Sequence, residues 1–83
     1  MKSDNKNEEF SDAHASAKGL LAHNLKFYRK HAKLSQEDLG LKIGADQAYI
    51  SRIEAGQLNP TIETLAELAS ALGVEVGSLL QWR

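Results

Sequence analysis

The sequence predicts an all-α fold of five short helices in one compact unit. Apolar residues recur at helical spacing from Leu21 to Leu80, no run alternates with the period of a strand, and capping residues and glycines divide the pattern into short segments. A chain of 83 residues is the size of one domain. A domain of this size buries only about 60% of the surface of its unfolded chain, which a helical bundle can achieve.

The first helix is expected to follow a polar segment. Residues 1–18 carry too few apolar side chains to offset the entropy lost on ordering, so we expect a flexible tail there and a folded domain over 19–83. The helix should begin between residues 11 and 19, with Ser16 as a candidate cap. Its apolar face is expected to carry Leu21, Leu25, Tyr28 and Ala32.

The segment SQEDLGLKIGADQAYISRIEAG, residues 35–56, has the capping residues and glycines expected of two short helices joined by a tight turn. Ser35 and Asp38 have the spacing of a capping box, with Asp in place of Glu. Gly44 suits the left-handed end of the first of these helices, and Asp46 suits the cap of the second, which Gly56 can end. The expected inward residues are Leu39, Ile43, Ile50 and Ile53, and Gly40 should let the two helices approach closely.

Two more helices complete the pattern. A fourth should begin at Thr61, because Asn59 precedes a proline, and should end at Gly73. Its inward face is expected to contain Ile62, Leu65, Leu68, Ala69 and Leu72. A last short helix should hold Val76, Leu79, Leu80 and Trp82.

An ordered set of residues extends this motif over the chain from about Leu21 to Leu80: Leu25 and Arg29, the step Leu34-Ser35-Gln36, Leu39, Gly44, the run ISRIE at 50–54, Gly56, Asn59-Pro60, Leu65, Leu68, Ala69, Leu72-Gly73 and Leu79-Leu80. The two helices and their turn resemble a helix-turn-helix, and the whole set is similar to the lambda-repressor/Cro (XRE-type) family of DNA-binding domains. The resemblance implies a compact five-helix lambda-repressor-like domain whose partner is double-stranded DNA. It also implies an ion pair between Arg29 and Glu54.

Two residues depart from the family pattern. Lys33 stands where glycine is common, so we expect a different turn there and an added contact to phosphate. Gly40 replaces the usual alanine and should lower stability, since glycine within a helix costs about 1 kcal/mol relative to alanine.

The second helix of the motif, about residues 46–55, should enter the major groove with its first residues at the base edges. We expect Gln47, Ala48 and Arg52 to read bases, because glutamine pairs with adenine, arginine with guanine, and alanine touches the thymine methyl group. Asp46 is expected to be a helix cap, although it could instead accept from the cytosine amino group. Expected backbone contacts are Gln36, Tyr49, Ser51, Lys33, Gln57 and Asn59.

Gln36 has the most specific role among the expected backbone contacts. At the start of the first helix of the motif, its side chain and the free N–H groups there could hold one phosphate. Such a contact fixes the docking register and carries no sequence information.

The formal net charge of −1 is unusual for a DNA-binding protein, but the charges are unevenly distributed. Residues 26–52 contain six basic residues against three acids, whereas residues 53–83 contain one against four. One end of the domain is therefore positive. Each lysine could also belong simply to a solvated surface.

Other classes of function have little support in the sequence. Without cysteine there is no disulfide and no thiolate metal site, and His14, His23 and His31 have no ligand partners at metal-binding spacing. No nucleophile with a base, phosphate loop or carboxylate pair is evident, so we expect a non-enzyme with no cofactor. No apolar run could span a bilayer and no signal peptide is recognisable, so we expect a soluble cytoplasmic protein.

One recognition helix reads few base pairs, and proteins with this motif bind paired half-sites as dimers. We therefore expect a homodimer through the apolar C-terminal residues Val76, Leu79, Leu80 and Trp82. The alternative is a monomer in which Leu79 and Trp82 fold back on the fourth helix.

The predicted function is sequence-specific transcription regulation, as by a repressor or a restriction-modification controller. The alternative is a protein-interaction module, such as an antitoxin or coactivator, with residues 1–18 as its binding arm.

Overall fold

The computed structural model describes residues 19–82. The N-terminal helix is described over residues 19–31 and is followed by α2 (Gln36–Lys42), α3 (Gln47–Glu54), α4 (Ile62–Leu72) and α5 (Val76–Leu79). These five helices, with no strand among the residues described, confirm the all-α prediction. The expected tail, its Ser16 cap, its role as a binding arm and His14 lie outside the described residues.

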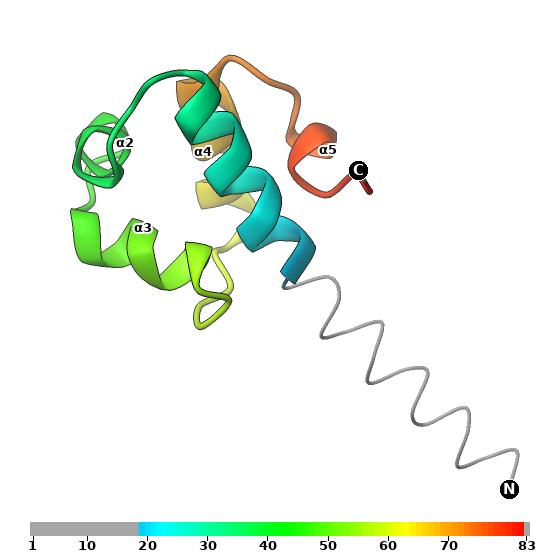
Figure 1. The fold of residues 1–83 in the computed structure, drawn as a ribbon, viewed down its shortest axis with the longest axis horizontal. Helices are drawn as coiled ribbons and strands as arrows, with labels where there is room; N and C mark the ends of the chain where they lie inside the picture. Colours follow the sequence, from blue (N-terminus) through cyan, green and yellow to red (C-terminus); the bar gives the residue numbers. More distant parts are fainter. Residues whose placement is uncertain (1–18, 83) are drawn as a thin grey trace, which may run out of the picture.

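One apolar core joins all five helices. In Figure 1, α2 and α3 lie on one side of the N-terminal helix and α5 lies on the other. The core residues are Leu21, Leu25, Leu39, Ile50, Ile53, Leu65, Leu68, Ala69 and Leu79. Burying each of the larger side chains stabilises the fold by about 1.5–3 kcal/mol. Because helices as short as α2 and α3 are not stable alone in water, this shared core is what holds them in place.

The predicted helix ends are present. Ser35 Oγ accepts from the Asp38 N–H at 2.9 Å, and the Ser35 N–H donates to the Asp38 carboxylate at 3.1 Å, which forms the complete capping box. Left-handed glycines follow three of the helices: Gly44, Gly56 and Gly73, with φ of 72–73°. These local signals therefore fix the lengths of α2, α3 and α4.

Two side chains expected in the core lie at its edge. Ile62 is 75% exposed, because it is the first residue of α4 and a helical side chain leans toward the N-terminus, here beyond the packed turns. Ala32 lies just past the N-terminal helix and is also exposed. The inward face of α4 therefore begins at Leu65.

The close approach of α2 and α3 occurs at Gly40. A Cβ atom at this position would lie 2.7 Å from the carbonyl oxygen of Asp46, the residue that caps α3. The backbone at Asp46 occupies the space that an alanine methyl group would need. The expectation that Gly40 weakens the fold considered helix propensity alone, whereas this contact shows that glycine is what lets α3 pack so near.

The turn before α2 also differs from expectation. Lys33 has φ of 61°, which lies in the left-handed region that glycine adopts readily. The turn therefore keeps the left-handed conformation that glycine adopts without strain, and Lys33 adopts it at an energetic cost. The prediction of a different turn at Lys33 is wrong.

Candidate nucleic-acid interface

The exposed side of α3 carries the three predicted base readers. Asp46 caps the helix by accepting from the Tyr49 N–H at 2.9 Å, and the first two residues of α3 are exposed. Ile50 and Ile53 are buried and fix the rotation of α3 about its axis. The side chains that consequently lie exposed are Gln47, Ala48 and Arg52.

The predicted backbone contacts divide into two groups. Exposed positions are Lys33, Gln57 and Asn59, whereas Gln36, Tyr49 and Ser51 are half-buried. Tyr49 packs against the core, so only part of its side chain is available to a partner. The exposed positions of this set come from the loops before α2 and after α3.

Arg29 and Glu54 form the ion pair that the family resemblance implies. The Arg29 Nε donates to Oε2 of Glu54 at 2.6 Å, and Nη2 donates to Oε1 at 3.1 Å. The side chains are only 9% and 4% exposed. Nη1 of Arg29 also donates to the Leu34 carbonyl at 2.8 Å, which ties the loop before α2 to the N-terminal helix. Loss of either charged partner would leave the other buried without its counter-charge, which typically costs about 3–5 kcal/mol.

Two glutamines extend this pair to the start of α3. Nε2 of Gln36 donates to Oε1 of Glu54 at 3.0 Å, and Nε2 of Gln47 donates to Oε1 of Gln36 at 2.7 Å. Sequence reasoning named all four residues, Arg29, Glu54, Gln36 and Gln47, but missed the two glutamine contacts. No local pattern indicates them, because they depend on how α2 and α3 cross.

Carboxylates lie close to the reading positions. A shallow hollow between α2 and α3 is lined by Glu37, Leu41, Ala45, Asp46, Gln47 and Ala48. Its two acids disfavour a phosphate at this edge. The positive groups in the described interface, among them Lys33 and Arg52, lie on residues outside this hollow.

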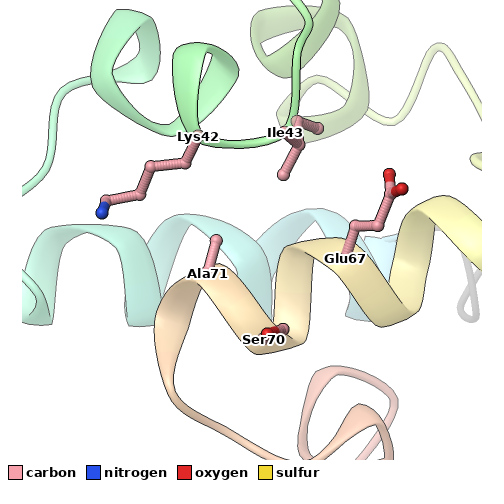
Figure 2. A pocket seen from close by; sticks show the side chains of 5 residues that line it. All are labelled: Lys42, Ile43, Glu67, Ser70 and Ala71. Atoms are coloured by element: carbon pink, nitrogen blue, oxygen red, sulfur yellow. The ribbon is translucent and has the colours of Figure 1, made fainter.

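A second hollow lies between α2 and α4, and Figure 2 shows Lys42 and Glu67 reaching away from one another across it. The remaining lining residues are Ile43, Ser70 and Ala71. None of the predicted DNA-contacting residues lines this hollow.

The C-terminal surface is smaller than predicted. Leu79 is completely buried in the chain's own core, so it cannot contact a second copy, and Val76 packs against the same core. Leu80 and Trp82 remain exposed, at 46% and 72%. The prediction of Leu79 as an interface residue is wrong, because α5 needs that side chain to dock on the rest of the domain.

Asn24 holds this C-terminal segment in place. Its Nδ2 donates to the carbonyl oxygens of Leu79 and Gln81, at 3.1 and 2.8 Å. The side chain is fully buried, and its Oδ1 has no hydrogen-bond partner among the residues that the structure describes. Sequence reasoning missed this residue, since its partners lie 55 and 57 positions away.

The two histidines of the described part of the chain lie at the surface. His23 and His31 are exposed, and the ring of His31 stacks on Phe27 with centroids 6.0 Å apart. Within residues 19–82 there is no group of three potential metal ligands. No helix of this part of the chain is long and apolar enough to cross a membrane.

The fold and the exposed face of α3 define the class of DNA-reading helix-turn-helix domains, and comparison with known proteins gives the same class. Residues 25–79 match the model of the helix-turn-helix family. The transcriptional regulator y4dJ of Sinorhizobium fredii is 44% identical over 55 residues, which cover 66% of this chain and 71% of the relative. Control protein C.SmaI of Serratia marcescens is 41% identical over 63 residues, covering 76% of this chain and 75% of that protein.

A solved structure shows the same likeness. The restriction-modification controller protein C.AhdI of Aeromonas hydrophila matches with a TM-score of 0.75 at 32% identity, covering 80% of this chain and 96% of that one. This chain belongs to the helix-turn-helix family of DNA-binding transcription regulators.

Proposed function

We propose that this protein recognises a specific DNA sequence by placing α3 in the major groove and regulates transcription from that site. The observation that carries the proposal is the division of α3, whose buried Ile50 and Ile53 leave Gln47, Ala48 and Arg52 exposed together. Glutamine and arginine can each form paired hydrogen bonds to one base, and alanine can contact a thymine methyl group. A regulator of this kind works in the cytoplasm and needs no catalytic group.

Contacts to the DNA backbone complete the interface. We assign phosphate contacts to Lys33, Gln36, Gln57 and Asn59, with Tyr49 and Ser51 at the flanks of α3. Gln36 is the first residue of α2, where free backbone N–H groups favour an anion. These contacts set affinity and orientation, whereas the readers on α3 set sequence preference.

We further propose that two copies bind two half-sites. One helix of eight residues covers only a few base pairs, and dimers with this motif read half-sites about one helical turn apart. Leu80 and Trp82 are large exposed apolar side chains two positions apart in sequence, and Asn24 bonds the backbone at Leu79 and Gln81 beside them. This pair is the surface that we assign to the second copy.

A restriction-modification controller is the narrower role that the comparisons favour. Two of the similar proteins are named as control or controller proteins, and this chain covers 75% and 96% of their lengths. The genes beside the coding sequence test this role. Neighbouring genes for an endonuclease and a methyltransferase would support the controller role. Their absence would contradict that role and leave the broader proposal of transcription regulation.

Binding to selected DNA tests the main proposal. The full chain would be used to select duplexes from a randomised pool, and affinities for one selected duplex and a scrambled duplex would be measured by fluorescence anisotropy over a range of salt. The affinity should fall steeply with salt. Arg52→Ala should cost about 1–3 kcal/mol on the selected duplex and relax the preference at one base pair. Equal affinity of the wild type for both duplexes would contradict sequence-specific recognition.

A further inference from the structure

The side-chain amide of Gln36 has a defined orientation because of Glu54. A carboxylate only accepts hydrogen bonds, so it faces the NH2 group of Gln36, which donates at 3.0 Å. The carbonyl oxygen of the Gln36 amide therefore faces Gln47 and accepts from its Nε2 at 2.7 Å. The hydrogen bonds thus form a series in which Gln47 donates to Gln36 and Gln36 donates to Glu54.

Glu54 cannot leave this arrangement easily. Two nitrogens of Arg29 donate to its two oxygens, and its side chain is only 4% exposed. If the Gln36 amide turned over, its oxygen would face a carboxylate oxygen, and two acceptors cannot bond to each other. No other hydrogen bond of the Gln36 or Gln47 side chain is present in the described part of the chain, so Glu54 is the fixed end of the series.

This order leaves Gln47 with a specific free edge. One hydrogen of its Nε2 is used by Gln36, so the second hydrogen and the carbonyl oxygen remain for a partner. Adenine offers an acceptor at N7 beside a donor at N6, and the side-chain amide pairs with both only when its donor and acceptor stand in the matching order. Reversal of the amide exchanges those two positions.

We infer that Glu54 is a positioning residue that sets the base preference of Gln47, acting through the amide of Gln36. The inference rests on the proposed function, in which Gln47 reads a base. It gives Gln36 a second task beside phosphate binding, and it makes the buried ion pair a determinant of sequence preference as well as of architecture.

The test is Glu54→Gln, which replaces one acceptor oxygen by a donor NH2 while keeping size and shape. The amide oxygen of the new glutamine can keep the bond from Arg29 Nε, which places its NH2 at the position of Oε1. There the NH2 faces Gln36 and favours the reversed amide, and the bond from Arg29 Nη2 is lost. The measured quantity is discrimination, the ratio of affinities for two selected duplexes that differ only at the base pair whose preference Gln47→Ala abolishes. A good bidentate contact gives a discrimination of about 5- to 150-fold, and Glu54→Gln should bring it close to the Gln47→Ala value.

Two further variants separate this role from a structural one. Gln36→Met breaks the series without touching the Arg29–Glu54 pair and should lose discrimination equally. Retained discrimination in Gln36→Met would overturn the inference even if Glu54→Gln does not remain folded by circular dichroism. Glu67→Gln, the same substitution at an exposed position of α4, should retain the wild-type discrimination. A merely structural role of Glu54 would lower affinity for both duplexes alike and leave their ratio unchanged.

The possible failures are distinguishable. If Gln47→Ala loses preference at a base pair while Glu54→Gln and Gln36→Met keep it, the inference is overturned and the proposed function stands. If Gln47→Ala changes no preference at any position, Gln47 is not a reader, and both the role assigned to it and the inference fail.

Discussion

The carbonyl group of Asp46 lies directly against the Cα atom of Gly40. A Cβ at Gly40 would stand 2.7 Å from the carbonyl oxygen and 2.8 Å from the carbonyl carbon of Asp46. Asp46, which caps α3, can occupy this position only because Gly40 of α2 has no side chain. The reading positions follow directly after this cap, so their location depends on the same contact.

Gly40→Ala should therefore destabilise the domain by about 1–3 kcal/mol, the usual range for forcing extra volume into a packed site. This loss should exceed the gain in helix propensity, which is about 1 kcal/mol. Urea unfolding followed by circular dichroism would measure it. Gly77→Ala is the matched control, because a Cβ there meets nothing within 4 Å. A Gly40→Ala variant more stable than wild type would show that α2 and α3 separate without cost.

Local signals made much of the fold predictable. Caps such as Ser35 and Asp46 act on backbone groups within three residues, and glycines such as Gly44 act on their own torsion angles. Which side chains are buried depends less on neighbouring residues in the sequence. Ile62 and Leu79 both follow the helical apolar pattern, yet Ile62 is exposed and Leu79 is in the core, because docking of the whole helix decides which apolar residue is covered.

The candidate site was predictable to a similar degree. The spacing of Ile50 and Ile53 was enough to predict which side of α3 faces outward, and the exposed Gln47, Ala48 and Arg52 agree with that spacing. The contact between Gln36 and Gln47 was not predictable, since it requires the crossing geometry of two helices.

Lys33→Gly should raise the free energy of unfolding by about 0.5–1 kcal/mol. A left-handed conformation costs a non-glycine residue about 1–2 kcal/mol, and the greater freedom of glycine in the unfolded chain offsets part of the gain. Lys33→Ala removes the same charge but keeps the strain, so its stability in urea should equal that of the wild type. Both variants should bind DNA more weakly, with a salt dependence reduced by about one counterion. Equal stability of the two variants would contradict this prediction, because the strain at φ of 61° would then be no larger than the entropic cost of glycine.

The capping box should be visible in the titration of Asp38. The backbone N–H of Ser35 and then its hydroxyl group are the main causes that lower the Asp38 pKa below the ordinary 3.8; burial opposes them, and the charge of Lys42 adds the smallest lowering effect. Because the pKa is lowered in the folded state, the stabilisation is complete above the unfolded value and is lost as the pH falls through the folded value. This stabilisation should therefore disappear only in acid below pH 3.8.

Ser35→Ala tests the origin of that shift by NMR titration of the Asp38 carboxyl carbon. Loss of the hydroxyl group should raise the Asp38 pKa part of the way toward 3.8, and loss of the cap should cost about 1 kcal/mol at neutral pH. Lys42→Gln should raise the pKa by less. If Lys42→Gln had the larger effect, the shift would come from charge and not from the capping box.

Substitution of the exposed C-terminal residues should dissociate the proposed dimer. Trp82→Ala should weaken self-association by about 2 kcal/mol or more, because a buried tryptophan is often a dominant contact of an interface. Sedimentation equilibrium would show the mass falling toward that of one chain, and binding to a duplex with paired half-sites should lose cooperativity. Leu80→Ser should act in the same direction.

Ile62→Ser is the control for these two variants, since Ile62 is as exposed as Trp82 but lies on α4. A wild-type protein that sediments as a single chain at micromolar concentrations would contradict the dimer and leave these side chains to another partner.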